Sequence, residues 1–266
     1  MKLIVLSDLH LPPPGHTHGA IDSYARFQAA IDRVNTAHGD ADLVVIAGDL
    51  VDRGQSEGYE GLRATIAACL PPVALTLGNH DERADFAAAF GPAYLDENGF
   101  AQSAYEIGDM RVIVLDSCNR KPSSEDKYSG AEGYLCAKRL SWLKNTLDDR
   151  PTILVLHHPV MGVRISLDSF ALSNPAPLLD LIDTHDVRAV VSGHIHMTTA
   201  SNRKGVAFYT IAGGHSTSRE DVPTGRNKMR FAGPAQMAVI LADLESTIIH
   251  FDNYVDANPT FERRTS

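Results

Sequence analysis

The sequence is poor in the features that mark several classes of protein. Only three of its 266 residues are cysteine, and no two of them form a C-x-x-C pair. This excludes a disulfide framework and a thiolate metal site. Apolar runs are short, and none approaches the roughly 20 residues of a membrane-spanning helix. Residues 3–6 are also too short a run for a signal-peptide core, so we expect a cytoplasmic protein.

Positive charge is scarce as well. The chain has 24 Lys and Arg against 33 Asp and Glu, a formal net charge of −9. Such a chain has no general attraction for a nucleic-acid duplex or an anionic membrane, and a phosphate-bearing partner would need a local source of positive charge. Histidine, by contrast, is abundant, with twelve residues. An acidic chain rich in histidine is the feature to explain.

Hydrophobic residues make up 44% of the chain, and two arrangements of them alternate along the sequence. Continuous apolar runs predict buried strands at 3–6, 42–46, 73–77, 111–115, 152–156 and 187–191. Helical spacing between them predicts helices at 24–34, 59–69, 82–90, 140–147 and 178–182. Strands that are apolar throughout are buried on both faces, which predicts an α/β fold with helices packed outside sheets.

The pattern changes after about residue 200. Residues 206–211, 236–241 and 246–251 resemble strands without intervening helices, while 216–234 are polar, contain Gly and Pro, and predict an irregular loop. We therefore expect one domain over residues 1–266, with a β-rich C-terminal portion.

Five polar clusters directly follow five predicted strands. They are Asp8-Leu9-His10, Gly48-Asp49-Leu50-Val51-Asp52-Arg53, Gly78-Asn79-His80-Asp81, His157-His158-Pro159 and Gly193-His194-Ile195-His196. Ligands of α/β folds bind beyond the carboxyl ends of the strands, so these clusters should converge. Carboxylates, imidazoles and one carboxamide, without sulfur, suit Mn, Fe, Co or Zn. Seven ligands are too many for one tetrahedral ion, whereas two ions sharing a carboxylate would use them all.

Two divalent ions would also supply the positive charge that the chain lacks. Their charge of about +4, less two carboxylates and one bridging hydroxide, leaves roughly +1 to face a phosphodiester. The metals would thus concentrate positive charge at one point on an acidic protein.

The ordered motifs D-x-H, G-D-x-x-D-R, G-N-H-D, H-H-P and G-H-x-H resemble those of the calcineurin-like metallophosphoesterases. They span residues 8–196 and are most similar to the small bacterial cyclic-nucleotide and glycerophosphodiester phosphodiesterases. The resemblance implies a four-layer αββα sandwich of the metallophosphoesterase type. It also implies that a metal-bound hydroxide hydrolyses phosphoric diesters such as cyclic nucleotides or glycerophosphodiesters.

The same resemblance implies a role for each motif residue. One ion would be held by Asp8, His10 and His196, and the other by Asn79, His157 and His194, with Asp49 bridging the two. His80 would face the substrate and stabilise the transition state or protonate the leaving oxygen, oriented by Asp81. Taken singly, Asp49 could instead cap a helix or turn, and Asn79 could be a turn residue.

Three further residues are candidate substrate contacts. Arg53 would bind phosphate, as in the related protein phosphatases, or form a structural ion pair with Asp52. His158 competes with His157 for one ligand position and would otherwise line the site or bond within its wall. His215 would approach the substrate from the C-terminal segment, or lie exposed in a loop.

Two other functions stay open at this stage. The chain could be a phosphomonoesterase, including a nucleotidase or protein phosphatase, because a bidentate Arg53 would neutralise a dianionic monoester. It could also be a catalytically silent binding scaffold, although every ligand position is filled. The expected partner is a small phosphodiester substrate. By analogy with related enzymes, we also expect the chain to form a homodimer or higher homo-oligomer through its C-terminal part.

Overall fold

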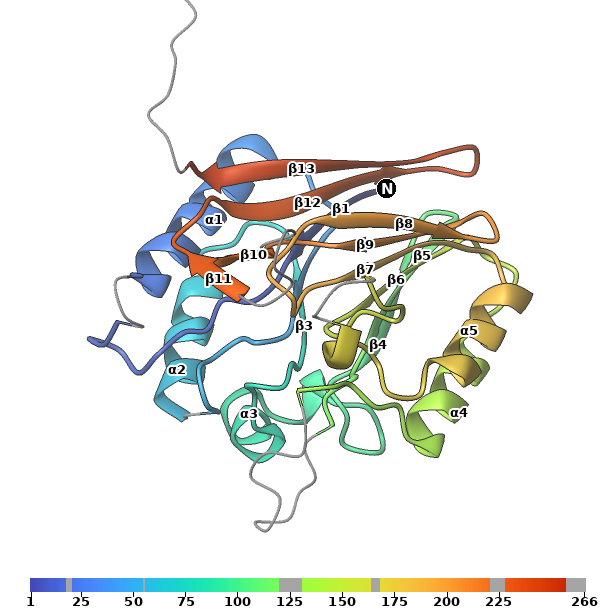
Figure 1. Ribbon diagram of the computed structural model, residues 1–266, viewed down its shortest axis with the longest axis horizontal. Coiled ribbons are helices and arrows are strands. Elements are labelled where there is room, and N and C mark those ends of the chain that lie inside the picture. Colours follow the sequence, from blue (N-terminus) through green and yellow to red (C-terminus); the bar gives the residue numbers. More distant parts are fainter. Residues whose placement is uncertain (18–20, 55, 120–130, 164–167, 221–227, 257–266) are drawn as a thin grey trace, which may run out of the picture.

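The computed structural model describes residues 1–17, 21–54, 56–119, 131–163, 168–220 and 228–256 (Figure 1). Its first sheet has the strand order β13-β12-β1-β2-β3. Three of these strands are parallel: β1 (Lys2–Leu6), β2 (Leu43–Ala47) and β3 (Val73–Thr76). The antiparallel pair β12 (Ala235–Ala242) and β13 (Thr247–Val255) continues the sheet beyond β1.

The second sheet has the order β4-β5-β6-β7-β9-β8. Its parallel centre consists of β5 (Met110–Leu115), β6 (Thr152–Leu156), β7 (Val187–Ser192) and β9 (Val206–Thr210). The antiparallel strands β4 (Ser103–Ile107) and β8 (Thr199–Arg203) form its two edges. All four central strands therefore end at the same edge of the sheet.

Successive side chains of these strands are buried in different hydrophobic cores, one on each face of the sheet. In the first sheet, Leu3, Val5 and Val45 contribute to a core that they share with Val112 and Val155 of the second sheet. This core is the layer of contact between the two sheets. Because successive side chains of a strand point to opposite faces, the intervening apolar residues are left to face helices.

Helices cover the outer face of each sheet. The first sheet packs against α1 (Ser23–Ala37), α2 (Ser56–Ile66) and α3 (Arg83–Phe90), and the second against α4 (Ala137–Thr146) and α5 (Pro175–Thr184). Two short 3-10 helices, Pro92–Tyr94 and Asp168–Phe170, lie in connections. The result is the predicted four-layer αββα sandwich (Figure 1).

The structure corrects the prediction for the C-terminal portion. Residues 216–234 are not simply an irregular loop, because β10 (Thr217–Glu220) and β11 (Lys228–Phe231) pair as an antiparallel ribbon. The sequence reading also missed the edge strands β4 and β8. The late strands complete both sheets, since β8 and β9 enter the second and β12 and β13 the first.

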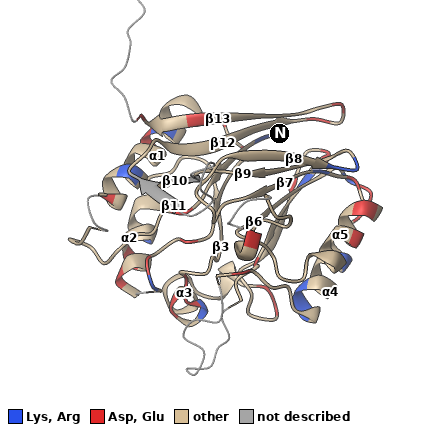
Figure 2. Ribbon diagram, in the orientation of Figure 1, with Lys and Arg blue, Asp and Glu red and all other residues tan. Residues whose placement is uncertain are grey.

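Charged residues lie mainly on the helices and connections. Figure 2 shows acidic and basic residues interspersed over the helices on both sides of the sandwich. Among the residues that the structure describes, no helix is both long enough and apolar enough to cross a membrane.

Candidate functional site

The loops after the central strands turn back sharply through left-handed backbone. Five of the seven predicted ligands have positive φ angles: Asp8 (55°), His10 (46°), Asp49 (50°), His194 (72°) and His196 (53°). For residues with a Cβ atom this conformation costs roughly 1–2 kcal/mol each. Such strain is concentrated at functional sites, where the surrounding structure holds it in place. Here it turns five side chains toward one region.

Two motif glycines allow these loops to approach one another. A Cβ atom on Gly78 would lie 2.2 Å from Oδ1 of Asp49, and one on Gly193 would lie 2.4 Å from Oδ2 of Asp8. Neither position has room for a larger residue. The glycines of the G-N-H-D and G-H-x-H motifs are therefore required by packing around the two carboxylates.

The first group of predicted ligands comes from the loops after β1 and β7. Nε2 of His10 lies 3.1 Å from Nε2 of His196, which in turn lies 3.4 Å from Oδ1 of Asp8. All three residues are at most 1% exposed. We call Asp8, His10 and His196 the first cluster.

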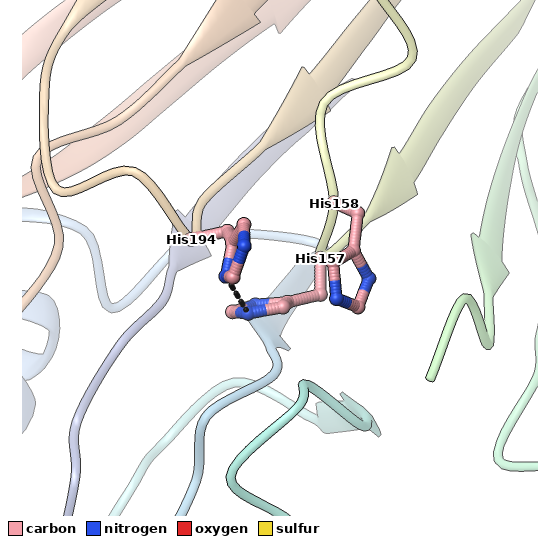
Figure 3. Close-up of side chains that lie close together, drawn as sticks. All are labelled: His157, His158 and His194. Atoms are coloured by element: carbon pink, nitrogen blue, oxygen red, sulfur yellow. Dashed lines mark hydrogen bonds between the residues drawn. The ribbon is translucent and has the colours of Figure 1, made fainter. Parts of the chain in front are cut away.

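The second group comes from the loops after β3, β6 and β7. Nε2 of His157 lies 3.1 Å from Nδ1 of His194 and 3.3 Å from Oδ1 of Asn79. Figure 3 shows His157 and His194 pointing toward one another from different strands. We call Asn79, His157 and His194 the second cluster.

Asp49 connects the two clusters through its two carboxylate oxygens. Oδ2 lies 3.5 Å from Nε2 of His10 in the first cluster, and Oδ1 lies 3.4 Å from Nε2 of His157 in the second. Oδ1 also accepts a hydrogen bond from the backbone N–H of His80, at 2.8 Å. Asp49 thus lies between the two clusters, and all seven residues predicted as ligands converge.

The spacing and hydrogen bonding of these atoms fit metal binding. Ligand atoms about 2.1 Å from one ion lie roughly 3.0–3.4 Å apart at common coordination angles, close to the separations observed. The other ring nitrogen of a metal-binding histidine usually donates to a backbone or carboxylate oxygen. Nδ1 of His157 donates to the carbonyl of Ala47 at 2.8 Å, and Nδ1 of His196 donates to that of Ser216 at 2.7 Å. Each Nε2 is thereby left as an electron-pair donor.

The protonation states follow from burial and neighbouring charge. Burial would raise the pKa of Asp49, but the imidazoles of His157, His80 and His10 outweigh it and hold that pKa well below its usual range. Burial, reinforced by neighbouring imidazoles, keeps the pKa of His194 well below its usual value. Burial also tends to lower the pKa of His157, but Asp49 raises it to about 9. A cation bound here would displace the proton from His157.

His80 lies beside the clusters and has a different partner from the one predicted. Its Nδ1 lies 3.2 Å from Oδ1 of Asp52, and its ring stands edge-on to that of His10, with centroids 4.5 Å apart. Burial would lower the pKa of His80, but the carboxylates of Asp49, Asp52 and Asp81 together raise it. The orienting hydrogen bond that was expected from Asp81 is made by Asp52.

Asp81 instead fastens the neighbouring loops together. Its buried carboxylate accepts hydrogen bonds from the backbone N–H groups of Gly78, Leu50 and Val51 and from the hydroxyl of Tyr59. Burial and the charge of Asp49 raise the pKa of Asp81 to about 6, against the effect of the backbone donors. Sequence reasoning missed Asp52 as the partner of His80, although it belongs to the G-D-x-x-D-R motif.

The three candidate substrate contacts lie in different surroundings. Nε of Arg53 lies 3.8 Å from Oδ2 of Asp52, and its side chain is 78% exposed. His215 is buried, not exposed in a loop, and its ring centroid lies 5.2 Å from that of His10. His158 has no exposed surface, so this conformation does not offer it to a substrate.

Two further stretches, Asp183-Thr184-His185 and His16-Thr17-His18, contain the patterns D-x-H and H-x-H outside the clusters, and His18 lies outside the described residues. Asp183 forms ion pairs with Arg203 and Lys204, and Nδ1 of His185 lies 2.8 Å from the carbonyl of Leu181. His16 is exposed. Neither D-x-H nor H-x-H is therefore informative without the strand context.

Comparisons with known proteins agree with this geometry. The sequence profile described as calcineurin-like phosphoesterase matches residues 1–198. A probable cyclic nucleotide phosphodiesterase of Rhodopseudomonas palustris is 29% identical over 274 residues, covering 100% of this chain and 97% of its own. The glycerophosphodiester phosphodiesterase GpdQ of Enterobacter lignolyticus is 28% identical over 218 residues, covering 79% of this chain and 76% of its own.

The fold has counterparts among solved structures. A dimetal phosphatase from Danio rerio superposes with a TM-score of 0.72, covering 96% of each chain at 15% sequence identity. At that identity the similarity concerns the fold alone.

Proposed function

Because the chain belongs to the calcineurin-like phosphoesterase family, we propose that it hydrolyses small phosphoric diesters with two divalent metal ions. Cyclic nucleotides and glycerophosphodiesters are the substrate classes, in line with the names of its relatives. The observation that carries the proposal is the pair of buried ligand clusters that meet at the carboxylate of Asp49. Mn, Fe, Co and Zn all suit these ligands.

Each cluster would hold one ion, and the shared carboxylate of Asp49 would keep the two ions together. When bound, such ions lower the pKa of water and withdraw electron density from the phosphate. The chain's own contribution is to fix the ligands, since the left-handed loops and the carbonyls of Ala47 and Ser216 set their directions. Ligands held this way need little rearrangement when an ion or a substrate binds.

His80 would supply the proton. Nδ1 faces Asp52, and the side chain is 30% exposed, so Nε2 is the nitrogen left to meet a substrate. The carboxylate of Asp52 beside Nδ1 stabilises the protonated ring. An imidazolium in this position would stabilise the developing charge or protonate the leaving oxygen.

The surroundings favour a diester over a monoester. A dianionic monoester is best bound by a guanidinium that is already aimed into the site. Arg53 is largely exposed and lies beside Asp52, so it is not held in such a position. We propose that Arg53 contacts the outer part of a bound substrate and that buried His215 lies near its phosphate.

A paired substrate panel tests the proposal. Metal-stripped protein is reconstituted with Mn²⁺, Co²⁺, Zn²⁺ or Fe²⁺, and its metal content is measured in parallel. Rates are then compared between bis(4-nitrophenyl) phosphate and 4-nitrophenyl phosphate, between cyclic AMP isomers and AMP, and between glycerophosphoethanolamine and glycerol phosphate. We expect faster turnover of the diester in each class that reacts. Faster monoester turnover would contradict the proposal, and loaded protein without turnover would indicate a binding scaffold.

A further inference from the structure

His158 directly follows His157, yet its side chain occupies a different place. Its ring centroid lies 4.8 Å from that of His157, edge-on, and 4.7 Å from that of His194 (Figure 3). It has no exposed surface. Both imidazoles of the second cluster therefore pack against the ring of His158.

Ser117 holds His158 at two atoms. Its Oγ accepts a hydrogen bond from the backbone N–H of His158 at 3.2 Å and lies 2.8 Å from Nδ1 of the same residue. Oγ can donate to Nδ1 or accept from it, and in either direction the contact is one hydrogen bond between the hydroxyl and the ring. One hydroxyl thus fixes both the backbone and the ring of His158.

The other side of His158 is closed by Gly133. A Cβ atom on Gly133 would lie 2.5 Å from Cγ and 2.7 Å from Cβ of His158, so the backbone of this glycine sits directly against the base of the ring. In a close-packed interior such contact leaves the imidazole little freedom to shift away from His157 and His194.

The loop that carries Ser117 is itself fixed by buried charge. The carboxylate of Asp116 pairs with Arg83 at 3.0 Å and accepts the backbone N–H of Cys118 at 2.9 Å. Arg139 donates to the carbonyls of Asp116 and Cys118 at 2.8 and 2.9 Å. Both neighbours of Ser117 are thereby held in place.

We propose that Ser117 and His158 are positioning residues for the second cluster, and that they set its affinity for an ion by fixing the imidazoles of His157 and His194. The inference rests on the proposed function, since it presumes an ion in that cluster. Residues that orient metal ligands in this way typically change metal affinity or activity about 10- to 100-fold when substituted.

The test is a titration of metal-stripped protein with Mn²⁺ against a competing chelator, for wild type and Ser117→Ala. We expect two binding steps in the wild type, and one of them weakened 10- to 100-fold in the variant. Asn79→Ala should weaken the same step. The other step is the one that Asp8→Asn weakens, and its Kd in Ser117→Ala should stay within about twofold of the wild-type value. Diester hydrolysis by Ser117→Ala should need a correspondingly higher Mn²⁺ concentration for half-maximal rate.

Two variants separate positioning from a loss of fold. Ser117→Thr keeps the hydroxyl and should restore the weakened step. Ser103→Ala removes a hydroxyl that donates to the Tyr105 hydroxyl on the edge strand β4, and should leave both steps unchanged. Equal weakening of both steps by Ser117→Ala, or no change in either, would overturn the inference. Because the titration does not depend on turnover, two bound ions without diester hydrolysis would contradict the proposed function alone.

Discussion

Asn79 and His80 are adjacent in the sequence, but their side chains have different partners. Oδ1 of Asn79 points to His157 within the second cluster, whereas Nδ1 of His80 pairs with Asp52 beside the first. The proposed function therefore gives metal binding to Asn79 and proton transfer to its neighbour His80. Their substitutions should separate in experiment.

Replacing His80 with alanine should lower kcat and leave metal content unchanged. General acid–base groups contribute roughly 10²–10⁴-fold to rate, so a loss of at least about 100-fold is expected. Steady-state kinetics on bis(4-nitrophenyl) phosphate, with metal analysis of the same samples, measure both quantities. Asn79→Ala is the matched control, because it should reduce the metal content of its cluster. Wild-type turnover in His80→Ala would refute the role of this imidazole.

The hydroxyl of Tyr59 should matter for stability through the loops of the site. It donates to Oδ1 of Asp81 at 3.1 Å and accepts the backbone N–H of Glu82 at 2.9 Å, in a fully buried position. Tyr59→Phe removes both bonds and should lower the free energy of unfolding by about 1–3 kcal/mol. Urea unfolding measures the change, with partly exposed Tyr134→Phe as control. An equal stability of wild type and Tyr59→Phe would show that the hydroxyl contributes nothing.

At the scale of elements, helix α1 joins segments that are distant in sequence. Nε of Arg26 donates to the carbonyl of Gly214 at 2.8 Å and its Nη2 to that of Gly233 at 2.6 Å, so the helix holds both ends of the β10–β11 ribbon. Further along, Arg33 pairs with Asp252 of β13. The helix thus connects the edge of the first sheet with the segment that carries His215.

The contact between α1 and β13 should give a pH-dependent contribution to stability. Burial would raise the pKa of Asp252, but hydrogen bonds from Arg33 and His38 outweigh it and lower that pKa. A carboxylate whose pKa is lower in the folded than in the unfolded state stabilises the folded protein at pH values above its unfolded-state pKa, about 3.9. This contribution is lost as the pH falls through the folded-state pKa.

Asp252→Asn should therefore cost about 0.2–1 kcal/mol at pH 7, and the difference from wild type should shrink below about pH 4. Thermal or urea unfolding across pH 3–7 measures it. Asp256→Asn, at an exposed position of the same segment, is the control. A difference that stays constant to pH 3 would argue against the ionic contribution.

The elements differ in how far the sequence predicts them. The central strands were predicted because they are apolar throughout, as burial between two layers requires. The edge strand β4 was missed because only alternate residues are covered, and β8 because its sequence, TASNR, is polar. At the site, the order of motifs predicted which side chains converge, and their role as metal ligands stays a prediction. The choice of Asp52 over Asp81 as partner of His80 depends on how two loops cross, which motif spacing does not encode.

At the scale of the whole molecule, the site draws on both sheets. The first cluster takes Asp8 and His10 from the first sheet and His196 from the second. The second cluster likewise combines Asn79, after β3, with His157 and His194 of the other sheet. Two bound ions would therefore cross-link the halves of the sandwich at one edge, and the acidic chain would carry its positive charge at that junction.

Removal of the ions should consequently destabilise the entire fold. An ion at 100 times its Kd stabilises the native state by about 2.7 kcal/mol, so two sites contribute roughly 5 kcal/mol. For a chain of this size that corresponds to a fall in Tm of about 10–20 °C on chelation. Differential scanning calorimetry before and after chelation, and after Mn²⁺ is restored, measures the shift. Asp49→Asn, which lacks the shared carboxylate, should respond much less. If chelation left the Tm of wild type unchanged, or shifted both proteins equally, the two clusters would not be joining the sheets through metal.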